Sequence, residues 1–534
     1  MKVLIIGGGA GGASCAAKLR RLDETAEILV LEKTPENSVA SCGLPYYVGG
    51  VIEDRADMLA ASPLLFKKLF NIEVKVNTEV VSVHIADKHV MTTSGDVYDY
   101  DKLVLATGSR AVIPQLKGLD NLPYFALKTL EDADKIKKYI AEHNVKTALI
   151  IGGGFSGIEL VDNFHILGIK TTVVEAGSQI LPVVDEDMVR QLEKTLRDNG
   201  VNLILNQRVE EILPDGAKLA NGEKINAQMV VFSLGNRPNA ELAQNAGIEL
   251  ENGFIKVDDY MQTSTSDVYA CGDCATTKDF VSGATVGGGM AGPANRQGRL
   301  IACHIAGKPY KNTPTLWTGV LKVFDKTVAF CGHSEAMLKK YNVAHQKMIV
   351  WTTTHAGYYP NAEWIALKVM FDEKSGKIFG AQAVGADGVD KRINVISTIM
   401  RLNGTVEDLR DAELCYAPPY SNAKDAINLI GMAIENIRQG QFKPYFGTDF
   451  DGFTVLDVRS RASYAEKHIE GAINIPAGQL RDRMAEIPRD KPLLVHCYRG
   501  YSSYVVVRIL MQNGFKDVFS YAGGWQQYEA ETLL

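Results

Sequence analysis

Two stretches of the chain repeat one pattern of apolar and polar positions. Each begins with a short apolar strand, expected at residues 2–6 and 147–151, which runs into three spaced glycines and then a helix of small and apolar residues. A second apolar strand follows in each stretch, at residues 27–31 and 171–174, and ends at an acidic residue. Strands and helices that alternate in this way predict parallel sheets covered by helices, an α/β fold.

The glycines in both stretches predict two Rossmann-like dinucleotide-binding domains. Glycine allows a tight turn and lets the backbone approach a pyrophosphate, whose charge lies at the N-terminus of the following helix. The acidic residue would accept hydrogen bonds from a ribose hydroxyl group. Two complete copies are a much stronger signal than one glycine triplet. The expected residues are Gly7, Gly9, Gly12 and Glu32 in the first copy, and Gly152, Gly154, Gly157 and Glu175 in the second.

The residues after the second acid favour one nicotinamide nucleotide over the other. Glu175 is followed by Ala176 and Gly177, so no arginine stands there to bind a 2′-phosphate. This favours NADH, and NADPH stays open.

Bulk composition excludes several classes of protein. The chain of 534 residues is 46% hydrophobic and 22% charged, as expected of a globular protein with several domains. A net charge of −6 gives no sign of nucleic-acid binding, and no apolar run approaches the roughly 18–20 residues that cross a bilayer. Eight scattered cysteines do not form a disulfide scaffold. We expect a cytoplasmic protein without nucleic-acid or membrane partners.

Three further motifs give the first 435 or so residues a family resemblance. Together with the glycine loops they resemble the pyridine-nucleotide disulfide reductases. The motifs are Ala106-Thr107-Gly108, Gly235-x-Arg237-Pro238-Asn239 and Ala270-x-Gly272-Asp273. The resemblance implies FAD at the first glycine loop, with Thr107, Gly108 and Asp273 also at the flavin, and NAD(P)H at the second. It also implies an α+β dimerisation domain and a homodimer.

One cysteine marks a branch of this family. Cys42 opens the segment Cys42-Gly43-Leu44-Pro45-Tyr46-Tyr47, and Tyr47 stands where two-cysteine reductases carry their second thiol. Cys42 must therefore pair with an external sulfur or cycle as a sulfenic acid. The segment resembles the single-cysteine branch, which contains coenzyme A-disulfide reductases, CoA-persulfide reductases, NADH oxidases and NADH peroxidases.

Two tyrosine segments resemble the coenzyme A-disulfide reductase type. They are residues 355–360 and 416–421, and the resemblance implies that Tyr358 and Tyr416 reach the reactive cysteine of the other subunit. A phenol there would donate a proton to a departing thiolate. The alternative is that both tyrosines only pack at the dimer interface.

The same resemblance suggests residues for coenzyme A and for the nicotinamide. Lys18 and Arg21 on the first helix would meet the phosphates of coenzyme A, and Ser38 and Ser41 would lie near the cysteine. The alternative for the two cations is a solvated helix face. Glu159 is expected at the contact between the nicotinamide and the flavin.

Three segments in the last ninety or so residues, at 456–459, 468–476 and 495–502, together resemble the rhodanese family. The strand at 493–496 ends at Cys497, and a short loop leads into a helix at 504–510, so loop N–H groups would stabilise a thiolate or persulfide at Cys497. Rhodaneses often have arginine where this chain has Ser502, and Arg499 is the nearest substitute. Phosphatase chemistry is not expected.

The spacing of Cys271 and Cys274 is that of a metal or redox pair, but they flank the flavin motif and lack a second ligand pair, so we expect no metal. The expected domains are 1–115 with 246–320 for FAD, 116–245 for NAD(P)H, 321–438 for dimerisation, 439–448 as a linker and 449–534 as the rhodanese-like domain.

These signals together predict an FAD-dependent NAD(P)H oxidoreductase that reduces CoA disulfide, CoA persulfide or polysulfide through Cys42. Cys497 would relay sulfur from inorganic sulfane sulfur donors, and hydrosulfide would be released. Two alternatives remain. One is an NADH oxidase or peroxidase that cycles Cys42 as sulfenic acid, and the other is a non-catalytic protein that senses sulfur or redox state.

Overall fold

The computed structural model describes residues 1–532 and divides into two compact units. The first unit contains Met1–Ser178 and Val201–Thr315, and the second contains Gln179–Gly200 and the chain from Leu316 onwards. Within the described residues, no helix is both long and apolar enough to span a membrane.

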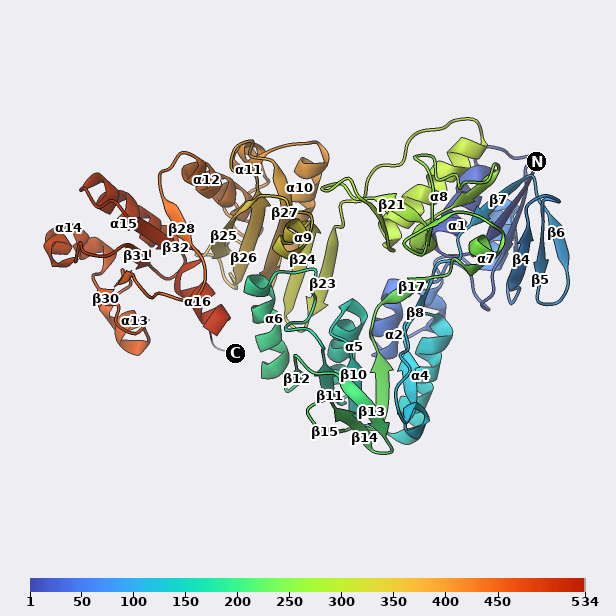
Figure 1. Ribbon diagram of the computed structural model, residues 1–534, viewed down its shortest axis with the longest axis horizontal. Coiled ribbons are helices and arrows are strands. Elements are labelled where there is room, and N and C mark those ends of the chain that lie inside the picture. The colour runs from blue at the N-terminus through green and yellow to red at the C-terminus, as the bar shows by residue number, and fades with distance from the viewer. Residues whose placement is uncertain (533–534) are drawn as a thin grey trace. The chain divides into compact units, whose positions relative to one another are not determined.

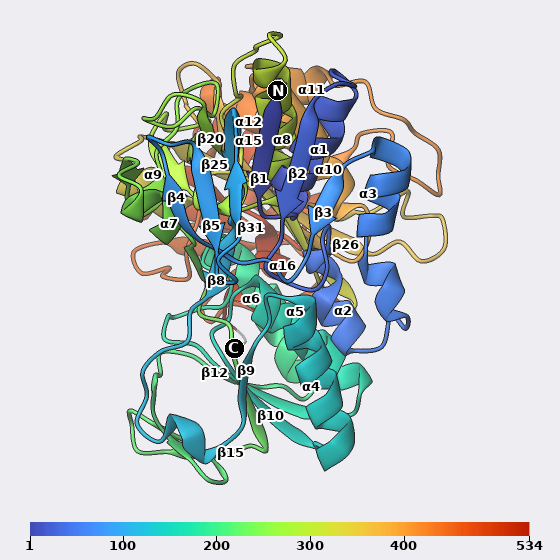
Figure 2. The same ribbon diagram turned by 90° about the vertical axis from the view of Figure 1, so that its right-hand side faces the viewer.

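The first glycine loop belongs to a parallel sheet of five strands in unit 1. Its strand order is β20-β7-β1-β2-β3, and helices α1 (Ala10–Arg20) and α8 (Ala291–Ile305) pack against each other beside it (Figures 1 and 2). The centre of the sheet is apolar, since β1 buries four consecutive side chains from Val3 to Ile6. The strands are β1 (Lys2–Ile6), β2 (Glu27–Leu31), β3 (Glu73–Lys75), β7 (Lys102–Leu105) and β20 (Val268–Ala270).

The second glycine loop belongs to another parallel sheet in the same unit, ordered β12-β11-β10-β16-β9. Helices α4 (Leu130–His143) and α5 (Phe155–Ile166) accompany it. The strands are β9 (Tyr124–Ala126), β10 (Thr147–Ile151), β11 (Lys170–Val174), β12 (Asn202–Ile204) and β16 (Met229–Phe232). The unit also contains two antiparallel three-stranded sheets: β4 (Val80–His84), β5 (His89–Thr92) and β6 (Val97–Asp99), and β13 (Val209–Leu213), β14 (Gly216–Leu219) and β15 (Lys224–Asn226).

Unit 2 contains an antiparallel sheet ordered β23-β24-β27-β26-β25, with helices α10 (Val389–Arg401) and α12 (Ala426–Arg438) packed on it (Figure 1). Its strands are β23 (Gly319–Val323), β24 (Lys326–Gly332), β25 (Gln346–Thr353), β26 (Trp364–Phe371) and β27 (Ile378–Gly385). Helix α6 (Glu186–Asp198) contacts β23 and β27, which groups it with this unit although it falls within the continuous range 116–245 expected for the nucleotide domain.

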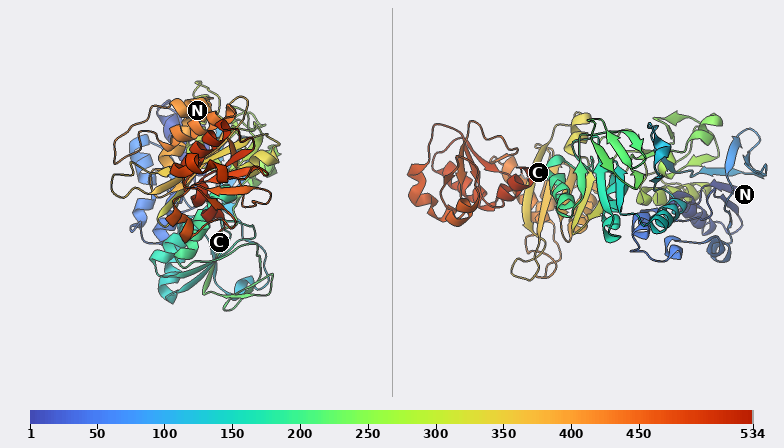
Figure 3. Two further views of the ribbon diagram at one scale, coloured as in Figure 1. Left: turned by 90° about the vertical axis from the view of Figure 1, so that its left-hand side faces the viewer. Right: turned by 90° about the horizontal axis from the view of Figure 1, so that it is seen from below.

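The C-terminal part of unit 2 is a parallel sheet ordered β28-β32-β31-β29-β30 with helices packed around it (Figure 3). Strand β28 (Lys443–Tyr445) lies inside the segment expected as a linker, and it pairs with β32 instead of bridging freely. The other elements are β29 (Thr454–Asp457), β30 (Ile473–Asn474), β31 (Leu493–His496), β32 (Val518–Tyr521), α13 (Arg461–Glu466), α14 (Leu480–Arg483), α15 (Tyr501–Gln512) and α16 (Gly524–Thr532).

Candidate functional site

The first glycine loop has room only where a ligand would approach. A Cβ on Gly7, whose φ is +102°, would lie 2.2 Å from the Ala106 carbonyl oxygen, and a Cβ on Gly12 would lie 1.9 Å from the Gly7 carbonyl oxygen. Both positions therefore require glycine. Gly9, at the N-terminus of α1, has no such neighbour within 4 Å. The open side of the loop fits a pyrophosphate at the helix N-terminus.

The second loop repeats this geometry. Gly152 has φ +105°, and its Cβ would lie 2.3 Å from the Ser233 carbonyl oxygen, while a Cβ on Gly157 would lie 2.6 Å from the Gly152 carbonyl oxygen. The nearest atom to a Cβ on Gly154 is 3.7 Å away. The chain therefore has two glycine loops of the same geometry, and each fits the pyrophosphate of a dinucleotide.

The acid of each copy contacts its own glycine loop, a role that the sequence pattern did not predict. Glu32 accepts a hydrogen bond of 2.7 Å from the Gly8 N–H, and Glu175 accepts one of 2.7 Å from the Gly153 N–H. Glu175 also accepts 2.7 Å from the Gly177 N–H. Each carboxylate thus fixes the loop beside the expected ribose position. The repeated spacing of glycine and acid could have revealed this contact.

The other expected flavin residues lie at the ends of adjacent strands. Thr107 and Gly108 follow β7, and Asp273 follows β20, which pairs with β7. The Thr107 hydroxyl donates to the Asn239 carbonyl oxygen at 2.6 Å. The Asp273 carboxylate accepts from the Ser109 hydroxyl at 2.6 Å and from the Lys128 ammonium at 3.0 Å. The structure therefore brings these residues to one edge of the FAD-type sheet.

Cys42 is exposed on a short 3-10 turn, Ser41–Gly43, directly before helix α2 (Leu44–Val48). On the same helix the Tyr46 hydroxyl lies 3.5 Å from a Glu159 carboxylate oxygen. Burial raises the pKa of Glu159 to about 7, and the Tyr46 hydrogen bond opposes that shift. The segment of Cys42 therefore lies beside the helix that follows the second glycine loop.

The residues expected to bind coenzyme A divide into two pairs. Ser41 adjoins Cys42, and the Ser38 N–H donates to the Gly8 carbonyl oxygen at 2.8 Å, so both serines lie near the flavin loop and the cysteine. Lys18 lies in the last turn of α1, about two turns from its start, and Arg21 caps the C-terminus of the helix. The Arg21 guanidinium lies over the Phe70 ring at 5.8 Å.

The two predicted tyrosines meet in unit 2. The hydroxyls of Tyr358 and Tyr416 lie 3.0 Å apart, and the side chains are 77% and 47% exposed. Their hydrogen bond raises the pKa of Tyr358. Sequence reasoning named both residues but not their direct contact, because 58 residues separate them.

These tyrosines line a cavity of about 760 Å³ that also receives a residue from the rhodanese-like loop. That residue is Arg499, whose guanidinium lies 4.4 Å from the centre of the Trp364 ring. Among the described residues, the lining carries the cations of Lys424 and Arg499 and no acidic side chain. Arg499 therefore stacks on Trp364 of strand β26. The sequence had suggested Arg499 as a charge for Cys497.

Cys497 is buried at the end of β31. The Gly500 N–H donates to its sulfur at 3.1 Å, and Gly500 has φ +97°, a conformation that favours glycine. The Trp525 N–H donates to the Cys497 carbonyl oxygen at 2.8 Å. A backbone donor aimed at the sulfur stabilises a thiolate or persulfide.

A buried charged pair packs on Trp525, the residue that is hydrogen-bonded to the Cys497 loop. Arg459 and Asp457 form an ion pair of 2.7 Å, and the Arg459 guanidinium lies 4.2 Å from the centre of the Trp525 ring. The neighbouring His496 is buried, and this burial lowers its pKa to about 4 against the opposing effect of Asp457. His496 is therefore neutral at physiological pH.

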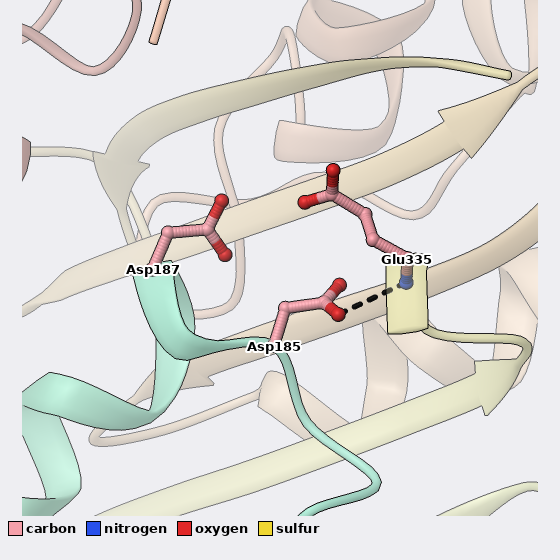
Figure 4. Close-up of side chains that lie close together, drawn as sticks. All are labelled: Asp185, Asp187 and Glu335. Carbon is pink, nitrogen blue, oxygen red and sulfur yellow. Dashed lines mark hydrogen bonds between the residues drawn. The ribbon is translucent and has the colours of Figure 1, made fainter. Parts of the chain in front are cut away.

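Two groups of side chains have the residue types of a metal site. Cys271 and Cys274 are buried, and burial raises the pKa of both thiols, which disfavours the thiolate that a metal would bind. Figure 4 shows an acidic group in unit 2, consisting of Asp185, Asp187 and Glu335. The fully buried Lys368 ammonium lies 3.0, 2.6 and 2.5 Å from these three carboxylates, so a lysine already supplies the cation.

Comparison with known proteins identifies the class. The pyridine nucleotide-disulphide oxidoreductase family matches residues 1–298, its dimerisation domain matches 319–427, and the rhodanese-like domain matches 446–531. The chain therefore belongs to the pyridine nucleotide-disulphide oxidoreductase family and carries a C-terminal rhodanese-like domain. The predicted family and the predicted mixed α/β fold class are confirmed. Membership implies FAD and a nicotinamide nucleotide.

Individual relatives are similar over most of the chain. A coenzyme A disulfide reductase of Staphylococcus haemolyticus is 32% identical over 80% of this chain and 98% of its own length. The solved structure of reduced Bacillus anthracis CoADR-RHD is 40% identical with a TM-score of 0.97, covering 99% of this chain and 98% of that one. A NAD-dependent persulfide reductase from A. fulgidus is 36% identical with a TM-score of 0.94, covering 99% and 100%.

Proposed function

We propose that this protein uses FAD and NADH to reduce coenzyme A-linked disulfides and persulfides at Cys42, and that Cys497 supplies the sulfane sulfur. The observation that carries the proposal is the shared cavity, which is lined by Arg499 of the rhodanese-like loop together with Tyr358 and Tyr416. Arg499, two residues after Cys497, and the two tyrosines thus border one space. The names of the relatives, a coenzyme A disulfide reductase and a NAD-dependent persulfide reductase, support the reduction of both kinds of substrate.

The first step belongs to the exposed cysteine. The Cys42 thiolate attacks the coenzyme A-linked sulfur of a disulfide or persulfide, forms a Cys42–S–S–CoA mixed disulfide, and expels a thiolate or hydrosulfide. Bound FAD supplies the two electrons, taken from NADH, that cleave this mixed disulfide to two thiolates. Because Tyr47 replaces a second cysteine, the thiol partner of Cys42 must come from the substrate.

The tyrosine pair would donate the proton. In the homodimer that the dimerisation domain supports, Tyr358 and Tyr416 would serve the partner's Cys42. Their exposed position and mutual hydrogen bond keep one phenolic proton available for the departing thiolate.

The binding residues follow from the two loops and the first helix. Lys18, Arg21, Ser38 and Ser41 would hold coenzyme A, with the two cations meeting its phosphates. Residues Gly7, Gly9, Gly12, Glu32, Thr107, Gly108 and Asp273 would hold FAD, and Gly152, Gly154, Gly157, Glu159 and Glu175 would hold NADH. With Ala176 and Gly177 after Glu175, the site lacks a cation for NADPH there.

The sulfur-carrying step belongs to the buried cysteine. The Cys497 thiolate would attack the outer sulfur of a persulfide or polysulfide donor, forming Cys497–S–SH while the donor's S–S bond breaks and the donor leaves as a thiolate or a shortened polysulfide. Attack by the coenzyme A thiolate on the outer sulfur then returns the Cys497 thiolate and yields CoA–S–SH. This product is the persulfide substrate of Cys42, so the two cysteines act in sequence.

The test is anaerobic NADH oxidation with CoA persulfide, CoA disulfide and glutathione disulfide as separate acceptors. Native protein is compared with Cys42→Ser and with Cys415→Ser, a control at another exposed cysteine. We expect turnover of about 1–1000 per second with the CoA acceptors. This turnover should be lost only in Cys42→Ser. Native protein and Cys415→Ser should both release hydrosulfide from CoA persulfide. Equal rates with glutathione disulfide would contradict coenzyme A specificity.

One solved relative favours a second candidate. A water-forming NADH oxidase from Lactobacillus brevis is 25% identical with a TM-score of 0.78, covering 82% of this chain and 99% of its own. An oxidase would be silent with all three anaerobic acceptors and would consume NADH rapidly once oxygen is admitted, with Cys42 passing through sulfenic acid.

A further inference from the structure

The position of the missing second cysteine holds a buried side chain with several partners. Tyr47 is 6% exposed, and it lies five residues after Cys42 on helix α2. In Figure 2, α2 lies next to α4 and α5, the two helices of the nucleotide-binding sheet, and it contacts both.

Tyr47 is attached to α4 through its hydroxyl, its ring and its backbone. The hydroxyl donates to the Asp134 carboxylate at 3.0 Å. The Lys137 ammonium donates to the Tyr47 carbonyl oxygen at 2.7 Å and lies 4.2 Å from the centre of the ring. Asp134 and Lys137 are one turn apart on α4, so they hold the tyrosine from two sides.

The same carboxylate connects this contact to the segment before the cysteine. Arg55 donates through Nε to the Asp134 carboxylate at 2.8 Å and through Nη2 to the Glu36 carboxylate at 2.6 Å. Burial raises the pKa of Tyr47, and the hydrogen bond to Asp134 raises it further, so the phenol stays a donor. The network thus spans the chain on both sides of Cys42.

We propose that Tyr47 is a positioning residue that holds Cys42 in place by fixing α2 against α4. A two-cysteine enzyme can tie its reactive sulfur through the second thiol, whereas this chain must hold one sulfur by contacts alone. Attack on a disulfide requires the reacting atoms in near-contact alignment, so a small displacement of α2 costs rate. The role in turnover rests on the proposed function, but the accessibility of Cys42 does not.

The test compares Tyr47→Phe, which removes only the hydroxyl, with Tyr139→Phe. Tyr139 also lies on α4 and donates to the Gln228 carbonyl oxygen at 3.3 Å. Asp134→Asn is the second variant, because it keeps the acceptor oxygen but removes its charge. The measurements are the alkylation rate of Cys42, read by peptide mass spectrometry, and the two anaerobic half-reactions followed by flavin absorption.

We expect Tyr47→Phe to change the alkylation rate and to slow flavin reoxidation by CoA disulfide by about tenfold, the order expected for a lost hydrogen bond to a charged group. Flavin reduction by NADH should change little, and Asp134→Asn should give a smaller effect of the same kind. Tyr139→Phe should resemble the native protein.

A parallel fall in both half-reactions together with the melting temperature would reduce Tyr47 to a packing residue and overturn the proposal. Unchanged alkylation and reoxidation would overturn it too. If native protein reduces no CoA disulfide, the proposed function fails, while the alkylation rates still decide whether Tyr47 positions Cys42.

Discussion

The two cysteines that we propose as nucleophiles are held in opposite ways. Cys42 is exposed on a short turn, and side chains from distant elements fix the helix that follows it. Cys497 is buried, and its own loop supplies the Gly500 N–H at 3.1 Å from the sulfur. In the proposed function, a cofactor, a substrate and residues of another subunit complete the first site. The second takes its sulfur and the N–H donor to it from one strand-loop-helix segment, with Trp525 bonded to the same loop.

Each cysteine also has a titratable neighbour, partly buried in the case of Glu159 and fully buried in the case of His496, and the two neighbours respond to pH in opposite directions. Glu159 lies beside the Cys42 helix with a pKa of about 7, and His496 precedes Cys497 with a pKa of about 4. Burial is the main cause of both shifts, because it disfavours the charged form of each group. The cost of burying a charge therefore makes the surroundings of Glu159 most stable at low pH and those of His496 most stable at neutral pH.

The largest effect on activity should come from replacing Cys42 and Cys497 by serine, one at a time. Cys42→Ser should lower NADH-linked disulfide reduction by about 1000-fold or more, because serine is a far weaker nucleophile than a thiolate. Cys497→Ser should abolish sulfur uptake from sulfane donors and leave CoA disulfide reduction unchanged. The measurements are NADH oxidation with CoA disulfide, and persulfide formation by mass spectrometry. Loss of both activities in either variant would mean that the sites are not separate.

The pH responses should be next in size. Glu159 carries a raised pKa, so stability in unit 1 is lost as pH rises from about 4.5 to 7, by about 3 kcal/mol. His496 carries a lowered pKa, so stability in unit 2 is lost as pH falls from about 6.5 to 4, by a similar amount. Glu159→Gln and His496→Gln should each flatten one of these dependences.

Two intrinsic probes separate the units in this experiment. All four tryptophans lie in unit 2, so their fluorescence follows its unfolding, while flavin release follows unit 1. Urea midpoints measured between pH 4 and 8 give the comparison. If a Glu159→Gln variant still loses stability in unit 1 as the pH rises from about 4.5 to 7, the burial of that carboxyl group is contradicted.

Dependence on another subunit gives a further contrast. Replacing both Tyr358 and Tyr416 by phenylalanine should slow turnover at Cys42 by about 100-fold, the usual scale for losing a general acid. Sulfur uptake at Cys497 should stay the same. The check is the kcat with CoA disulfide beside the rate of persulfide formation, and an unchanged kcat would leave the pair as interface packing.

The smallest effect should appear at the turn beside Cys497. Gly500→Ala forces an L-residue into a left-handed conformation, since φ is +97°. The strain should displace the N–H donor and lower sulfur uptake by about tenfold. Gly514→Ala is the control, because it also has positive φ, at +82°, but follows the end of helix α15, away from the cysteine. Equal losses in both variants would point to general strain.

Local patterns in the sequence predicted much of this arrangement. The glycine loops, their acids and the strand that ends at Cys497 lie in short continuous segments, so spacing alone located them. The contacts of Tyr47 with Asp134, and of Arg499 with Trp364, join residues 87 and 135 positions apart, and no local period encodes them. The grouping of α6 with unit 2 and the pairing of β28 were missed for the same reason.

The central claim is that the two cysteines act in sequence, and a single-turnover experiment tests it most directly. Cys497 is loaded with one sulfane sulfur, excess donor is removed, and NADH is added anaerobically with or without coenzyme A. The account predicts one hydrosulfide per loaded Cys497 in the presence of coenzyme A, and none in Cys42→Ser. Hydrosulfide release from Cys42→Ser at the native rate would contradict it.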